Sequence, residues 1–108
     1  MELKELLQII TRLNENINNA NKTYTKKELL LLKSLKLGEE VGELNNEILK
    51  QLGFARADKL KNLDKNELAG EIADVIITAL GIAYEFEIDV ESILDTKLKK
   101  IFDRLNIN

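Results

Sequence analysis

Apolar residues recur at helical spacing along almost the whole chain, and this periodicity constrains the fold more than any other feature. No segment shows the sustained alternation or the β-branched bias that is typical of a strand. The sequence also contains no proline, cysteine or tryptophan, which excludes a disulfide scaffold and suits a chain built mostly of helices. The pattern therefore predicts an all-α protein.

Capping residues and a glycine stop divide this pattern into four helices. Thr25 followed by Glu28 fits a capping box, in which side chains satisfy free amides at a helix start. Gly53 is a typical helix stop, and Asp64 and Asp89 stand where caps of two later helices are expected. With caps included, the expected helices cover about residues 2–18, 25–52, 64–86 and 89–106.

The size and charge of the chain limit its class. At 108 residues, we expect a single domain over residues 1–108. The longest unbroken apolar run, Leu29 to Leu32, is far shorter than the roughly 20 residues that span a membrane, and Met1 leads into a charged segment. A cytoplasmic protein without a membrane partner is the default expectation. The net charge of −3 gives no reason to expect nucleic-acid binding.

Two pairs of acids lie beside the apolar stripes of the second and third expected helices. At about 100° per residue, Glu40 and Glu43 fall on the same side of the second stripe. Glu71 and Asp74 take the same offsets on the third helix, which is otherwise apolar nearly all round and should be buried by neighbours or a second subunit. Antiparallel packing of these helices would bring the four carboxylates together.

Four carboxylates gathered in a partly dry site would repel one another strongly, so they would take up protons or bind a cation. An all-oxygen ligand set favours a hard ion, and we expect Mg²⁺, with Mn²⁺ as a substitute. The sequence has no histidine, which argues against the Glu-x-x-His pairs of di-iron bundles. The alternative for each acidic pair is a solvated helix face, where most charged residues lie.

Two cations lie near the apolar face of the fourth expected helix. Lys97 falls within the arc of apolar residues, and Arg104 lies near its edge, two turns further on. Lys97 either runs its aliphatic stem along the core to reach water or extends toward the anionic groups of a substrate. The residues alone leave both interpretations open.

The segment from about Lys36 to Arg104 resembles the MazG-like nucleotide pyrophosphohydrolases, the all-α NTP pyrophosphatase superfamily. Its matching parts are KLGEEVGEL, a spacer, and ELAGEIADVIITALGIAYEFEIDVESILDTK. They follow the order E-E-x-x-E, spacer, E-x-x-D, and then an Asp and a Lys in the last helix. The resemblance implies a four-helix MazG-like bundle that is completed by homo-oligomerisation, as a homodimer or homotetramer.

The resemblance also implies hydrolysis of a nucleoside triphosphate between its α and β phosphates, in nucleotide-pool sanitation or turnover. The positions that match metal ligands of the family are Glu40, Glu43, Glu71 and Asp74. Lys97 and Arg104 match positions that contact phosphates, whereas Ile101 stands where relatives often carry asparagine. By the same resemblance, Glu39 or Glu43 would assist deprotonation of the attacking water, with one or two metal ions bound.

Two other hypotheses stay open at the level of sequence. The chain would be a non-catalytic helical dimerisation or regulatory module if its acidic stripe faced solvent or a basic partner. The same charges would also serve a metal-dependent hydrolase of another phosphoanhydride. The preferred base and sugar are not indicated by any residue pattern.

Overall fold

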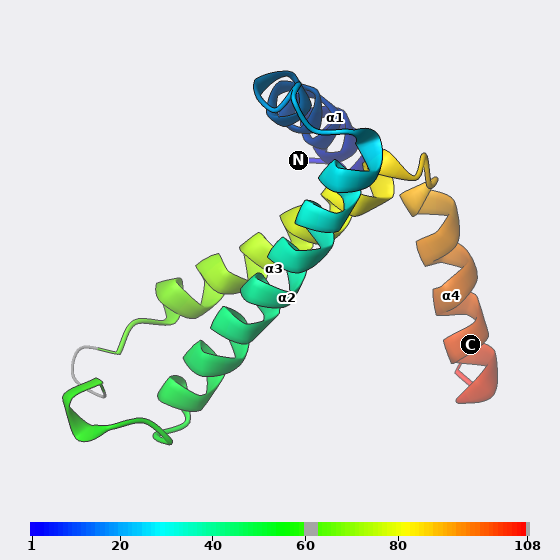
Figure 1. The fold of residues 1–108 in the computed structure, drawn as a ribbon. Coiled ribbons are helices and arrows are strands. Elements are labelled where there is room, and N and C mark those ends of the chain that lie inside the picture. Colours follow the sequence, from blue (N-terminus) through cyan, green and yellow to red (C-terminus); the bar gives the residue numbers. More distant parts are fainter. Residues whose placement is uncertain (60–62, 108) are drawn as a thin grey trace.

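The computed structural model of the chain describes residues 1–59 and 63–107. This part of the chain forms four α-helices and one short 3₁₀ turn, and it contains no strand (Figure 1). The elements are α1 (Leu3–Ala20), α2 (Lys26–Gln51), η1 (Ala57–Lys59), α3 (Lys65–Glu85) and α4 (Val90–Arg104). The prediction of an all-α fold with four helices is confirmed. No described helix is both long and apolar enough to span a bilayer.

The helices begin at the capping residues that the sequence carries. The Thr25 hydroxyl accepts a hydrogen bond from the Glu28 N–H at 3.1 Å, and the Glu28 carboxylate accepts one from the Thr25 N–H at 2.9 Å. Asp64 and Asp89 cap α3 and α4, since each carboxylate accepts a bond from a backbone N–H in the first turn. All three predicted starts are therefore confirmed.

Helix α2 ends in a turn that holds the backbone of Phe54 against the end of the helix. Gly53 has a φ of +84°, a left-handed conformation that glycine adopts without steric cost. The N–H of Phe54 donates to the Leu49 carbonyl at 2.8 Å, and the N–H of Gly53 donates to the Lys50 carbonyl at 3.0 Å. This is the hydrogen-bond pattern of a Schellman motif, and it fixes where the chain leaves α2.

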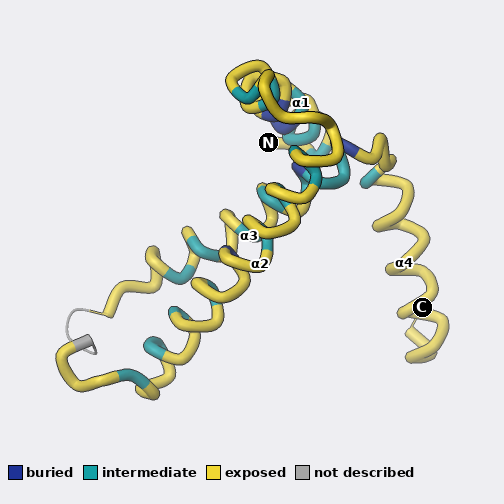
Figure 2. The backbone as a smooth tube through the Cα atoms, viewed as in Figure 1, coloured by how far each residue is buried: buried dark blue, intermediate teal, exposed yellow. Residues whose placement is uncertain are grey.

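Helices α2 and α3 lie side by side and antiparallel, and α1 crosses the end of the pair that carries the C-terminus of α3 (Figure 1). Most of the buried residues gather at this crossing (Figure 2). Gly81 allows the close approach of α1, because a Cβ at this position would lie 3.0 Å from Asn14 Oδ1. Helices α2 and α3 therefore pack antiparallel, which is the arrangement needed to bring the predicted acidic pairs together.

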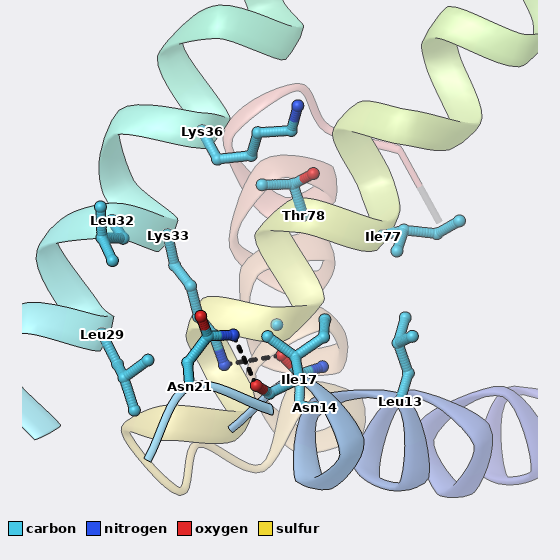
Figure 3. A pocket seen from close by; sticks show the side chains of 11 residues that line it. Leu13, Asn14, Ile17, Asn21, Leu29, Leu32, Lys33, Lys36, Ile77 and Thr78 are labelled. Atoms are coloured by element: carbon cyan, nitrogen blue, oxygen red, sulfur yellow. Dashed lines mark hydrogen bonds between the residues drawn. The ribbon is translucent and has the colours of Figure 1, made fainter. Parts of the chain in front are cut away.

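A buried ion pair joins the three helices at the crossing. Lys33 Nζ on α2 lies 2.6 Å from Glu85 Oε1 on α3, and the two side chains are only 12% and 5% exposed. Lys33 also donates to Asn14 Oδ1 at 2.8 Å (Figure 3), and Asn18 donates to Glu85 Oε1 at 2.6 Å. Burial raises the pKa of Glu85, but hydrogen bonds from Lys33 and Asn18 and the charge of Lys33 outweigh it, so the pKa lies below its ordinary value.

Helix α4 stands apart from the α2–α3 pair, and every described residue from Glu91 onward is exposed (Figures 1 and 2). Leu98 and Leu105, on the arc predicted to face a core, are 53% and 57% exposed, because no described helix of the same chain covers them. Ile10 is the one large apolar residue that is buried among those described. The single chain thus leaves long apolar faces open.

Candidate metal centre

Three carboxylates from α2 and α3 come together on the facing sides of the helix pair. Glu40, Glu43 and Glu71 each offer one oxygen, and these three oxygens lie within 4.8 Å of one another. Glu40 and Glu43 are one turn apart on α2, and Glu71 meets them from α3 because the two helices run antiparallel. A group of this kind is able to hold a hard divalent ion.

The two deepest carboxylates each carry an oxygen without a partner. Glu40 is 6% exposed and Glu71 is partly buried. The Oε2 atoms of both residues are buried, and among the described residues neither receives a hydrogen bond. Such an oxygen costs free energy in a folded protein unless a proton or a cation satisfies it. The carboxylates therefore fit a metal ion, and they are supplied by two separate helices.

Repulsion within the group acts most clearly on Glu43, the exposed member. The charge of Glu40 raises the pKa of Glu43 above its ordinary value, and partial desolvation and the charges of Glu71 and Glu39 raise it further. The charge of Lys36 lowers this pKa, but it does not cancel the rise. A divalent cation would offset the repulsion that the three carboxylates exert on one another.

Lys36 lies one turn before Glu40 on α2 and contacts two acids. Its Nζ is 3.0 Å from Glu40 Oε1 and 3.3 Å from Glu39 Oε1. These hydrogen bonds, the one to Glu40 first, raise the pKa of Lys36. Lys36 thus pairs with Oε1 of Glu40, whereas Oε2 of the same carboxylate is buried without a partner among the described residues.

A cavity of about 770 Å³ opens beside the carboxylates. Glu43 and Glu71 line it on the side of the candidate metal centre. The C-terminal part of α2 and the turn after it supply most of the remaining lining, including Lys50, Phe54 and Arg56. The size of the cavity is within the range of small-molecule sites in proteins.

A second cavity, of about 380 Å³, lies where α1 crosses the helix pair (Figure 3). Its walls are mostly apolar and include Leu13, Ile17, Leu29, Leu32 and Ile77. Lys36 lines it, but the carboxylates of the candidate metal centre do not. This cavity is therefore separate from the acidic group.

Residues 3–100 match the family model of phosphoribosyl-ATP pyrophosphohydrolase. The chain belongs to this family. The family is part of the all-α NTP pyrophosphatase superfamily, so the predicted resemblance is confirmed, as is the prediction of an enzyme acting on a phosphoanhydride bond. The hypothesis of a non-catalytic module loses its support. Searches of curated proteins and of solved structures gave no match.

This pyrophosphohydrolase brings three of its four predicted metal ligands together, and the other predicted residues lie outside that group. Asp74 is exposed, one turn beyond Glu71 on α3. The side chain of Glu39 is 58% exposed and pairs with Lys36. Lys97 and Arg104 are exposed on α4, a helix that stands apart from the α2–α3 pair in the single chain (Figure 1). The functional roles of all these residues stay predictions.

Two residues of the pyrophosphohydrolase that line the larger cavity have no role predicted from the sequence. Phe54 and Arg56 lie between the end of α2 and η1, in a segment without a recognisable binding motif. The one available signal is local: Gly53 predicts a left-handed turn, and an aromatic residue directly after such a turn is held close to the helix end. The end of the predicted spacer, at residues 60–62, falls outside the described residues.

Proposed function

We propose that the chain hydrolyses the bond between the α and β phosphates of a nucleoside triphosphate, with release of pyrophosphate and the monophosphate. The observation that carries this proposal is that Glu40 and Glu71, from two helices, each bury an unpartnered oxygen and belong to one group of carboxylates within 4.8 Å of one another. They support a bound cation, and membership of a pyrophosphohydrolase family supports the phosphoanhydride as the bond that is cleaved.

In this proposal Mg²⁺ is held by Glu40, Glu43 and Glu71, with Asp74 as a fourth ligand and Mn²⁺ as a substitute ion. A carboxylate-bound divalent ion polarises phosphate oxygens and neutralises the charge that develops on them. Lys36 orients Glu40 by binding its Oε1 atom at 3.0 Å. This contact keeps the buried carboxylate in one position before substrate arrives.

The attacking water gives its proton to a carboxylate at the edge of the group. Glu43 is exposed and lines the larger cavity, so a water molecule there reaches it directly. Glu39 is the alternative base, but its carboxylate pairs with Lys36 at 3.3 Å and lies outside the group of three carboxylates. We therefore assign the proton transfer to Glu43 first and to Glu39 second.

The proposed enzyme is a single domain that works as a homodimer or homotetramer in the cytoplasm. The apolar residues that α4 leaves exposed, among them Leu98 and Leu105, support cover by a second copy of the chain. Such a copy would also add cations for the phosphates, since Lys36, Lys50 and Arg56 of the described chain already pair with acids. Lys97 and Arg104 on α4 are proposed for this role.

Two substrate classes follow from this proposal. Phosphoribosyl-ATP is favoured by the name of the family that matches residues 3–100. Ordinary and damaged nucleoside triphosphates, the substrates expected from the sequence, carry the same triphosphate and offer the same bond. Both classes would use the candidate metal centre in the same way and release pyrophosphate, so a comparison of rates across substrates separates them.

The test is a panel of phosphoribosyl-ATP, NTPs and dNTPs, each incubated with the protein and millimolar Mg²⁺. Pyrophosphate should be released from at least one of them, and orthophosphate from none. Loss of a residue that only hydrogen-bonds to a metal ligand lowers activity roughly 10- to 100-fold. Glu71 is proposed to bind the metal directly, so Glu71→Gln should lower the rate by more than this. Glu15→Gln, an exposed acid on α1, is the matched control. Absence of pyrophosphate from every nucleotide would overturn the proposal.

A further inference from the structure

The larger cavity is continuous with the candidate metal centre, because Glu43 and Glu71 belong to both. If triphosphate oxygens bind at the carboxylates, as the proposed function requires, the sugar and base of the same molecule must extend into neighbouring space. The smaller cavity at the α1 crossing does not include these carboxylates. The larger cavity, of about 770 Å³, is therefore the adjoining space that has room for a nucleoside.

The charges of this cavity favour an uncharged group away from the metal centre. Its acidic lining residues are Glu43, Glu47, Asp58 and Glu71, against Lys50 and Arg56 as the basic ones. Lys50 is already bound, at 2.7 Å from Glu67 and 3.4 Å from Glu47. Arg56 lies 3.7 Å from Asp58. Away from Glu43 and Glu71, two acids therefore balance two bases, and both described bases are paired with acids. This part of the cavity attracts a phosphate little and suits an uncharged nucleobase or sugar.

Phe54 gives this cavity a flat apolar surface in a defined position. The ring is 75% exposed, although the residue after a Schellman glycine usually packs against its own helix. Its backbone is nevertheless held by the 2.8 Å bond from its N–H to the Leu49 carbonyl. Aromatic rings presented in this way stack on nucleobases, whose faces are equally flat and apolar. Asn46, also in the lining, offers an amide donor and acceptor to a base edge.

We propose that the nucleobase of the substrate binds in this cavity, stacked on the ring of Phe54, while its phosphates lie at Glu40, Glu43 and Glu71. This inference rests on the proposed function for the position of the phosphates. It assigns a binding role to a segment of the chain that no sequence motif singles out.

Kinetic measurements on Phe54→Ala test the stacking contact. With the substrate that the wild-type enzyme hydrolyses fastest, KM should rise roughly 5- to 100-fold, which is the range that loss of one base-stacking contact produces. Inhibition by AMP should weaken by a similar factor, whereas inhibition by pyrophosphate, which has no base, should stay unchanged. Phe86→Ala is the matched control, since Phe86 is also exposed at a helix end but does not line the cavity.

A binding measurement tests the same contact without catalysis. The chain has no tryptophan, so Phe54→Trp introduces a single indole as a fluorescent reporter. AMP with Mg²⁺ should quench this fluorescence in a saturable way, and ribose 5-phosphate should not. Phe86→Trp should respond to neither compound. This arm separates the two proposals, because base binding is measured even if no pyrophosphate is released from any nucleotide.

Three outcomes would overturn the inference. The first is no saturable quenching of the Phe54→Trp reporter by AMP. The second is an equal loss of AMP and pyrophosphate inhibition in Phe54→Ala, which would mean that the ring supports the metal centre and not the base. The third is a change in the sedimentation coefficient of Phe54→Ala, which would make Phe54 a contact between copies of the chain.

Discussion

Glu40 on α2 and Glu71 on α3 belong to one group of carboxylates whose oxygens lie within 4.8 Å of one another. Each of the two also buries an oxygen that has no hydrogen-bond partner in the described part of the chain. Two such oxygens destabilise a metal-free protein, because burial and mutual repulsion act on the same pair of charges. A bound cation reverses both effects. The stability of the fold and the occupancy of the site should therefore be linked.

The first prediction is that Mg²⁺ or Mn²⁺ raises the melting temperature. An ion at 100 times its Kd stabilises the native state by about 2.7 kcal/mol. For a chain of this size that corresponds to a rise in Tm of roughly 10 °C. Calorimetry of EDTA-treated protein, with and without the ion, measures it. Glu71→Gln should lose most of the shift, and Glu15→Gln should keep it. An ion-independent Tm in the wild-type chain would contradict the prediction.

The second prediction concerns Asp74, which lies one turn from Glu71 but outside the group of three carboxylates. If Asp74 is a fourth ligand, Asp74→Asn should raise the Mg²⁺ concentration for half-maximal activity by at least about tenfold. The rate at saturating Mg²⁺ should fall much less. A metal titration of pyrophosphate release distinguishes this from an exposed acid without a role, for which the titration curve would not move.

The helices were predictable because caps and periodicity are local, and the acidic group because equal offsets on two helices meet when those helices pack antiparallel. Thr25 and Glu28 are three residues apart, and the offsets of Glu40 and Glu43 follow from the pitch of a single helix. The contact between Lys33 and Glu85 depends instead on where α1 crosses the pair, which no local pattern encodes. The same holds for the cavity at Phe54, because a concave surface arises from several elements at once.

Helix α4 shows most clearly what could not be predicted from the sequence. Its apolar arc was predictable from periodicity, and its N-cap at Asp89 was as well. The position of Lys97 relative to the carboxylates was not, because it depends on the direction that the chain takes after Glu87, a residue with a φ of 54°. A pattern on one helix indicates which side is apolar, but not which helix of which copy covers it.

The third prediction is that Lys33→Met destabilises the chain by about 3–5 kcal/mol. The substitution leaves the buried Glu85 carboxylate without its 2.6 Å partner, and the cost of removing one member of a buried pair is of this size. Urea unfolding at fixed protein concentration measures it. Replacement of both members by Lys33→Met with Glu85→Leu should recover most of the loss. If the double variant were as unstable as the single one, the burial argument would be wrong.

The fourth prediction follows from the lowered pKa of Glu85. A carboxyl group whose pKa is lower in the folded than in the unfolded chain stabilises the fold fully above its unfolded pKa, which is about 4.5. That stability is lost as the pH falls through the lower, folded pKa. Melting curves in EDTA should therefore show a decline in Tm below about pH 4.5 that is shallower in Glu85→Gln. Parallel declines in the two proteins would exclude this residue as the cause.

The last prediction joins the open face of α4 to the proposed oligomer. Leu98 is 53% exposed in the single chain, so Leu98→Asp should weaken self-association if a second copy covers it. Lys100→Gln changes the net charge by the same amount at an exposed neighbouring position and should leave the oligomer intact. Sedimentation velocity over a range of concentrations compares the two variants. If Leu98→Asp left the oligomeric state unchanged, the proposed interface would not include this face of α4.

A mixing experiment then asks whether Lys97 acts across subunits. Glu71→Gln and Lys97→Gln should each be nearly inactive alone, since one loses a metal ligand and the other a phosphate contact. In an equal mixture of the two variants, about half of the dimers contain one copy of each. If a site combines Glu71 of one copy with Lys97 of its partner, one of the two sites in such a mixed dimer has both native residues. Roughly a quarter of wild-type activity should then return. Sites built from Glu71 and Lys97 of the same copy would give no recovery, since every copy would carry one of the two substitutions.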